Sequence, residues 1–191
     1  NKVDSNNFGY YSYITYMYYW NGLMNRNRMT YNKVTSSSGG YIYAMSNFYF
    51  FNLQMNNNLI ANNTGYYGLM GLYAYSYNSG TYYAECKQNT IYVDASNAGY
   101  SYHYAYGLYF YPYYHTNIDV TGNLIDVRNS YGCYPAYTYN QNGTTAYKRW
   151  DYNNYYLQNV SYQYWYNNNG SANDLAGWNN LGFAGPNETG H

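Results

Sequence analysis

The sequence predicts an all-β protein: an antiparallel β-sandwich of the jelly-roll or immunoglobulin-like kind with roughly eight to ten strands. Three observations predict this fold class. Tyrosine alternates with other residues over short stretches, turn-forming Asn and Gly recur between those stretches, and aromatic residues make up 25% of the chain. Alternation places one residue type on one face of a strand, whereas a helix would scatter it around the circumference. The 191 residues are enough for one domain with a sizeable core.

The densest alternation lies in residues 99–115, which read GYSYHYAYGLYFYPYYH. Four tyrosines share one face of this predicted strand and are interpreted as an aromatic surface or interface: Tyr100, Tyr102, Tyr104 and Tyr106. After Gly107 the alternation changes phase, and a bulge or bend at this glycine would return the later tyrosines to the same face. Pro112 has no amide donor and therefore predicts an edge or the end of the strand.

In chain order, residues 1–20 are expected to form an extended N-terminal segment, 21–176 the β-sandwich domain, and 177–191 a Gly- and Asn-rich tail. Two hairpins are predicted. Residues 71–77 pair with 81–93 across a short glycine-containing loop, and residues 118–127 fold around a two-residue turn at 122–123. Other β segments are predicted at 10–20, 31–34, 41–55, 59–60, 134–139, 144–152 and 155–166.

Composition restricts the possible partners. Tyr occurs 37 times and Asn 32 times, and the eight basic and eight acidic residues give a net charge of zero. No charged residue occurs between Lys33 and Glu85. A surface with so little charge favours association of the chain with itself, and it lacks the clustered Lys and Arg that nucleic acid requires. Residues 5–25 are uncharged but too rich in Tyr, Ser, Thr and Asn for a membrane span.

Two cysteines, Cys86 and Cys133, lie far apart in the sequence and without CxxC spacing. In a secreted β domain they predict a disulfide, and the alternative is a pair of buried free thiols. Five Asn-x-Ser/Thr triplets are candidate acceptors of N-linked glycans, and we expect sugars on at least two of them: Asn62, Asn142, Asn159, Asn169 and Asn187.

The predicted turn at 122–123 places Asp119 opposite Asp126. Opposed like charges destabilise a sheet, so the pair is expected to be solvated or paired with Arg128. The weaker alternatives are a bound cation or a proton shared at low pH. His103 and His115 have no zinc-site spacing, and no G-x-S-x-G element is present. The sequence therefore predicts no catalytic site, no cofactor and no enzyme activity.

The Tyr and Asn bias, the near absence of charge and the scattered glycan triplets resemble the secreted surface-filament (pilus- or thread-like) and surface-layer subunits of thermophilic archaea. The resemblance implies a glycosylated β-sandwich subunit that forms a homopolymer outside the cell. It also implies donor-strand complementation, in which an N-terminal strand, here within residues 1–20, completes the sheet of a neighbouring subunit.

The predicted function is thus that of a structural subunit of an extracellular filament or cell-surface coat, assembled by β-strand addition and through aromatic-rich interfaces. The alternative is a secreted carbohydrate-binding module or lectin that uses exposed Tyr and Trp faces. We favour the first, because the tyrosines are spread along nearly the whole chain, whereas a binding groove would concentrate them.

Overall fold

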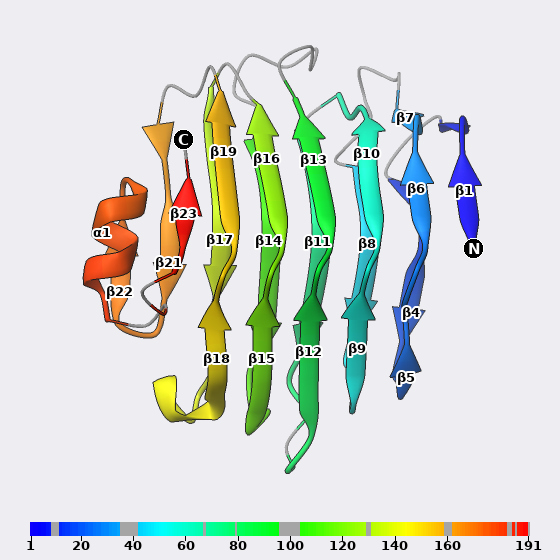
Figure 1. Cartoon of the computed structure of the whole chain (residues 1–191). Helices are drawn as coiled ribbons and strands as arrows, with labels where there is room; N and C mark the ends of the chain where they lie inside the picture. The colour runs from blue at the N-terminus through cyan, green and yellow to red at the C-terminus, as the bar shows by residue number, and fades with distance from the viewer. Residues whose placement is uncertain are drawn as a thin grey trace.

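The chain winds through three β-sheets whose neighbouring strands are almost all parallel (Figure 1). The computed structural model describes residues 1–8, 12–34, 42–66, 68–78, 80–95, 104–128, 131–158, 162–182, 185 and 187–190. Four successive turns of the described chain repeat one order of strands: β8–β9–β10, β11–β12–β13, β14–β15–β16 and β17–β18–β19. Each member of a triplet enters a different sheet and pairs with its counterpart in the next turn. This arrangement is a parallel β-solenoid.

The nine-stranded sheet contains β22 (Gly170–Ala172), β21 (Trp165–Asn167), β20 (Tyr162–Gln163), β17 (Gly132–Thr138), β14 (Tyr104–Pro112), β11 (Gly68–Ser76), β8 (Ile42–Phe48), β4 (Tyr16–Tyr18) and β3 (Ser12–Tyr13). The seven-stranded sheet contains β1 (Lys2–Asp4), β6 (Arg28–Thr30), β10 (Leu59–Asn63), β13 (Thr90–Asp94), β16 (Leu124–Arg128), β19 (Asn154–Gln158) and β23 (Thr189–Gly190). The five-stranded sheet contains β18 (Tyr147–Asp151), β15 (Asn117–Thr121), β12 (Tyr83–Lys87), β9 (Leu53–Asn56) and β5 (Gly22–Leu23). A separate parallel pair joins β2 (Asn7–Phe8) to β7 (Lys33–Val34), and two short helices are η1 (Thr144–Ala146) and α1 (Leu175–Asn180).

The predicted antiparallel β-sandwich is therefore wrong, although the all-β class is confirmed. Period-two alternation identifies a strand with one buried face, but it does not identify the partner strand. The predicted hairpin at 118–127 shows the consequence. β15 and β16 lie in different sheets, and residues 122–123 form the corner between them rather than a hairpin turn. The four predicted inward residues are all buried: Ile118, Val120, Ile125 and Val127. The hairpin predicted for 71–77 and 81–93 is wrong for the same reason, since β11 pairs with β8 and β14.

The predicted role of the N-terminal segment as a donor strand is also contradicted. β1 pairs with β6, and both β3 and β4 pair with β8 of the same chain. The described part of residues 1–20 is thus already hydrogen-bonded into the first turn of its own solenoid. At the other end of the stack, α1 lies beside β22 and β21 (Figure 1) and buries Trp178 against Trp150 and Trp165. The segment predicted to be a loose tail contributes to this cap.

Buried asparagines form a column at the corner between the five-stranded and seven-stranded sheets: Asn27, Asn58, Asn89, Asn123 and Asn153. The side-chain oxygen of Asn89 accepts hydrogen bonds from the backbone N (3.0 Å) and Nδ2 (2.9 Å) of Asn58. Its own Nδ2 donates to Asn123 Oδ1 (2.9 Å) and to the backbone oxygen of Met55 (2.8 Å). The same pattern continues until Glu188 Oε1 accepts from the backbone N and Nδ2 of Asn153, both at 2.9 Å. The column satisfies buried polar groups that the corner would otherwise leave unpaired.

Candidate interaction surface

The outer side of the nine-stranded sheet is covered by tyrosines. On β14, Tyr104, Tyr106, Tyr109 and Tyr111 face outward, while the intervening residues are buried. The predicted change of phase is confirmed, since Gly107 and Leu108 both face inward. There is no room for a side chain at this position, because a Cβ at Gly107 would lie 2.6 Å from Ile125 Cγ2 and 2.8 Å from the backbone oxygen of Pro135. Strand β14 ends at Pro112, as predicted.

We call this surface the tyrosine face. Its aromatic contacts connect Tyr13, Tyr16, Tyr18, Tyr19, Tyr43, Tyr49, Tyr73, Tyr75, Tyr77, Tyr104, Tyr106, Tyr109, Tyr111, Tyr113, Tyr134, Tyr137, Tyr139, Tyr164 and Tyr166. Of the four tyrosines singled out in the sequence, Tyr104 and Tyr106 lie on it, and Tyr100 and Tyr102 lie outside the described residues.

Parallel, in-register pairing stacks tyrosines of adjacent turns. One column runs from Tyr73 through Tyr109 and Tyr137 to Tyr166, with ring centroids 4.7, 4.7 and 4.8 Å apart and interplanar angles of 14°, 4° and 20°. These distances match the separation of about 4.7–4.9 Å between adjacent strands. Where the register places other residues opposite each other, the stacking is lost: Tyr43 and Tyr73 meet edge to face at 89°.

Stacking determines what the tyrosine face presents to solvent. Within a column, each ring covers the face of its neighbour, so the exposed parts are ring edges and hydroxyl groups. Burial raises the pKa of Tyr109, and repulsion from Tyr73 and Tyr137 raises it further. The pKa of Tyr137 is raised for similar reasons, with burial again the largest cause. The hydroxyls are therefore protonated at neutral pH, and each is both a donor and an acceptor.

The face carries no formal charge, because the strands of the nine-stranded sheet contain no Asp, Glu, Lys or Arg. Charged side chains gather instead on the other sheets. On the five-stranded sheet, Lys87 lies 3.1 Å from Glu85 and 2.9 Å from Asp119, which also pairs with Arg149 at 3.3 Å. Burial opposes ionisation of Asp119, but its bonds with Lys87 and Arg149 outweigh this and lower its pKa.

The two aspartates that the sequence placed opposite each other are separated. Asp119 is on β15 and Asp126 is on β16 of another sheet, where Asp126 pairs with Arg128 at 3.0 Å. The expectation of an Arg128 partner is confirmed, but the opposition of the two carboxylates is wrong because the hairpin does not form. In the described part of the chain, no group of three or more His, Cys, Asp or Glu could hold a metal ion.

The two cysteines are buried free thiols in the structure. Cys86 is on β12 of the five-stranded sheet and Cys133 is on β17 of the nine-stranded sheet, two turns further along, so the predicted disulfide is not formed. Burial raises the pKa of both thiols, that of Cys133 to about 12. His103 lies outside the described residues, and His115 is buried with Nε2 2.6 Å from the backbone oxygen of Phe51.

Four of the five glycan triplets lie among the described residues, and their asparagines are all exposed: Asn62, Asn142, Asn169 and Asn187. None of the four belongs to a strand of the nine-stranded sheet. Glycans on them would therefore be attached outside the strands that carry the tyrosine face. Asn159 lies outside the described residues.

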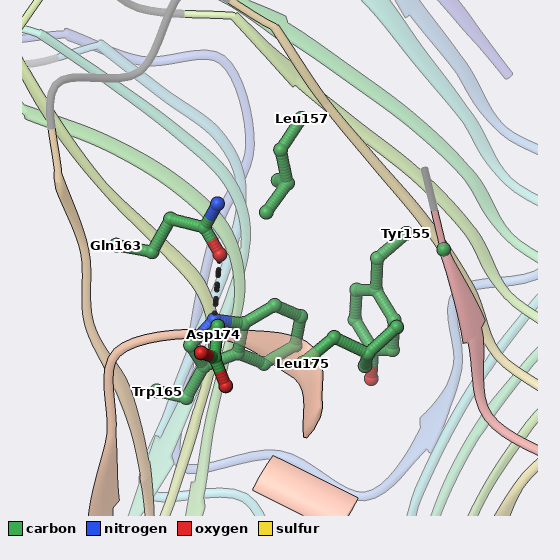
Figure 2. A pocket seen from close by; sticks show the side chains of 7 residues that line it. Tyr155, Leu157, Gln163, Trp165, Asp174 and Leu175 are labelled. Carbon is green, nitrogen blue, oxygen red and sulfur yellow. Dashed lines mark hydrogen bonds between the residues drawn. The ribbon is translucent and has the colours of Figure 1, made fainter. Parts of the chain in front are cut away.

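A small pocket of about 160 Å³ lies near the C-terminal cap, and Figure 2 shows its lining. It is bounded by Tyr155, Leu157, Gln163, Trp165, Asp174, Leu175 and Gly190. Two of its polar side chains are already engaged, since Gln163 Oε1 accepts from Trp165 Nε1 (3.1 Å) and Asp174 Oδ1 accepts from the backbone N of Gly177 (2.6 Å). The tyrosine face is the larger and more regular feature, and it is the candidate site.

No protein-family model, curated protein or solved structure matches this sequence. The described residues contain no helix of the length and apolar character needed to cross a membrane.

Proposed function

We propose that the chain is a structural subunit of an extracellular coat or filament, and that its copies associate through the tyrosine face. The observation that carries the proposal is an uncharged sheet face covered with stacked tyrosines. Tyrosine is enriched at protein interfaces because its ring provides contact area while its hydroxyl bonds to a partner. Two such faces would complement each other, since every hydroxyl can donate to one and accept from another.

The ends of the solenoid favour lateral association over end-to-end stacking. Stacking into a continuous filament would require an open sheet edge at each end. Helix α1 and the antiparallel strand β22 lie at the C-terminal end of the nine-stranded sheet (Figure 1). The four described glycan asparagines lie outside the strands of that sheet, and this arrangement is compatible with a glycosylated surface protein whose tyrosine face takes part in contacts.

The carbohydrate-binding alternative receives less support from the ring geometry. A sugar ring stacks on an exposed aromatic face, but in the columns of the tyrosine face neighbouring tyrosines occupy the ring faces at 4.7–4.8 Å. A ligand approaching this surface would meet ring edges and hydroxyls. Such a surface is better suited to hydrogen bonding with another flat array than to sugar stacking.

Analytical ultracentrifugation over a range of concentrations tests the association. The wild-type chain is expected to form dimers or larger species. The double variant Tyr16→Lys/Tyr77→Lys replaces two side chains of the tyrosine face that are 51% and 40% exposed, and it should remain monomeric. In a two-fold contact each new charge appears twice, and desolvating unpaired charges opposes binding.

The matched control is Tyr31→Lys, because Tyr31 is 57% exposed but follows β6 on the seven-stranded sheet. It adds the same charge and should leave association unchanged. A wild-type chain that stays monomeric at every concentration, or equal weakening by the control, would refute association through this face. Sedimentation with insoluble cellulose or chitin tests the alternative: binding by the wild-type monomer would favour a carbohydrate-binding function.

A further inference from the structure

Two tyrosine pairs on β14 and β17 have rings that are closer to parallel than those of the other stacked pairs in the described part of the chain. Tyr106 and Tyr134 have ring centroids 4.4 Å apart and an interplanar angle of 3°. Tyr109 and Tyr137 are 4.7 Å apart at 4°. In both pairs the residues are direct register partners, so the side chains leave parallel strands at equivalent positions. Their hydroxyl-bearing ends therefore lie side by side, and a side-chain hydrogen bond between Tyr106 and Tyr134 agrees with this.

We propose that these pairs are sites of oxidative cross-linking, at which a one-electron oxidant joins Tyr106 to Tyr134 and Tyr109 to Tyr137 as dityrosine. All four side chains are half-buried and lie on the outer side of their sheet, so an oxidant in solution can reach the ring edges. The carbons next to the two hydroxyls are adjacent in a parallel stack. Holding reacting groups together in this way replaces a bimolecular encounter with an intramolecular step.

The chemistry requires an external oxidant, here hydrogen peroxide with a haem peroxidase. Each of two phenols loses one electron and one proton, and the resulting radicals form a carbon–carbon bond between the ring positions next to oxygen. The two hydrogens on those carbons then move to the oxygens and restore both phenols. Hydrogen peroxide accepts the two electrons and two protons and becomes two molecules of water. The net change in the protein is the loss of two hydrogen atoms.

The bond would connect adjacent turns of the solenoid and hold β14 to β17 covalently. Because the proposed bonds join tyrosines within one molecule, their formation does not require association through the tyrosine face.

Tryptic mapping of the oxidised monomer tests the proposal. Cleavage after Lys87, Arg128 and Lys148 places Tyr106 and Tyr109 in the peptide 88–128, and Tyr134 and Tyr137 in the peptide 129–148. The oxidised chain should show dityrosine fluorescence and a linked species of these two peptides, lighter than their sum by two hydrogens for each bond formed. Fragment spectra then assign the linked residues. Oxidation is performed at low protein concentration, and the monomer is isolated before digestion.

The double variant Tyr106→Phe/Tyr109→Phe keeps the stacked rings but removes two phenols. It removes both proposed links, so the yield of the linked peptides should fall by about tenfold, to what less closely aligned pairs such as Tyr111 and Tyr139 (5.7 Å, 23°) supply. The control Tyr92→Phe lies in the same tryptic peptide but on β13 of the seven-stranded sheet, and it should leave the yield unchanged. Urea-unfolded wild-type chain should also give a much lower yield.

Three results would overturn the proposal. One is an absence of linked peptides under conditions that couple free N-acetyltyrosine amide. Another is an equal yield from the folded chain, the unfolded chain and the double variant. The third is cross-linking confined to covalent dimers.

Discussion

Removing one amide from the middle of the asparagine column should destabilise the fold far more than removing an exposed one. In Asn89→Ala, the backbone N and one Nδ2 proton of Asn58 lose their acceptor, and the backbone oxygen of Met55 loses its donor. Each buried group left unpaired costs about 1–3 kcal/mol, so three of them amount to about 3–9 kcal/mol. A domain is typically stable by only about 5–15 kcal/mol, so the variant should be close to unfolding.

Urea denaturation followed by circular dichroism measures this loss. The exposed Asn173→Ala serves as the surface control and should change stability little. Asn27→Ala, at the first turn, removes the acceptor of only the Asn1 Nδ2 donor, so its cost should be intermediate. A decrease of less than about 1 kcal/mol for Asn89→Ala, the worth of one ordinary hydrogen bond, would refute the argument that the column supports the corner.

Two further changes test the packing and the buried ionisable groups. Gly107→Ala places a Cβ 2.6 Å from Ile125 Cγ2, and such overpacking should cost about 1–3 kcal/mol and lower the melting temperature. Burial raises the pKa of Glu188 to about 7 from 4.5, so this carboxyl alone should lower stability by about 3 kcal/mol as the pH rises from 4.5 to 7. Burial lowers the pKa of His115 to about 4 from 6.5, so this ring alone should raise stability by about 3 kcal/mol as the pH rises from 4 to 6.5. The two effects oppose each other in the wild-type chain. Glu188→Gln keeps an acceptor for Asn153 and leaves only the His115 effect, so a melting series against pH should show its stability rising by about 3 kcal/mol between pH 4 and 6.5. If Glu188→Gln follows the same pH profile as the wild-type chain, the Glu188 carboxyl does not contribute to it.

Much of the local structure could be predicted from residue patterns. Alternation correctly assigned the inward side of Ile118 and Ile125 and the outward side of Tyr104 and Tyr106. The phase change at Gly107 was also recognisable, because two tyrosine series of opposite parity met there. Each of these predictions depends on one strand at a time, and a strand's two faces differ in the same way whether its partner is parallel or antiparallel.

The sheet topology depends on which strands of successive turns pair, and the sequence has no regular repeat from which that pairing could be inferred. Asn27, Asn58 and Asn89 are spaced by 31 residues, but the next intervals are 34 and 30, so no strict repeat emerges. A search for Asn directly before an aliphatic or aromatic residue pair, with the interval left free, would find Asn58 and Asn123 of the column and Asn154, the residue after Asn153. Corner residues such as Gly122 were interpreted as hairpin turns because the same residue types serve both purposes.

The high content of Asn and Tyr and the low content of charged residues follow from the stacking of equivalent side chains in successive turns. In a parallel, in-register solenoid each side chain meets its counterpart one turn away, so a column of charged residues repels itself. Glu85 and Asp119 are such counterparts, and Lys87 lies within 3.1 Å of both. Asparagine needs no third group, because its amide donates to one copy and accepts from another, and tyrosine stacks on its own ring. In this chain the corners and one whole sheet face consist of residues that pair with their own kind. Asn and Tyr are therefore frequent, and charged residues are few. The same property supports our proposal that the tyrosine face associates with a second copy of itself.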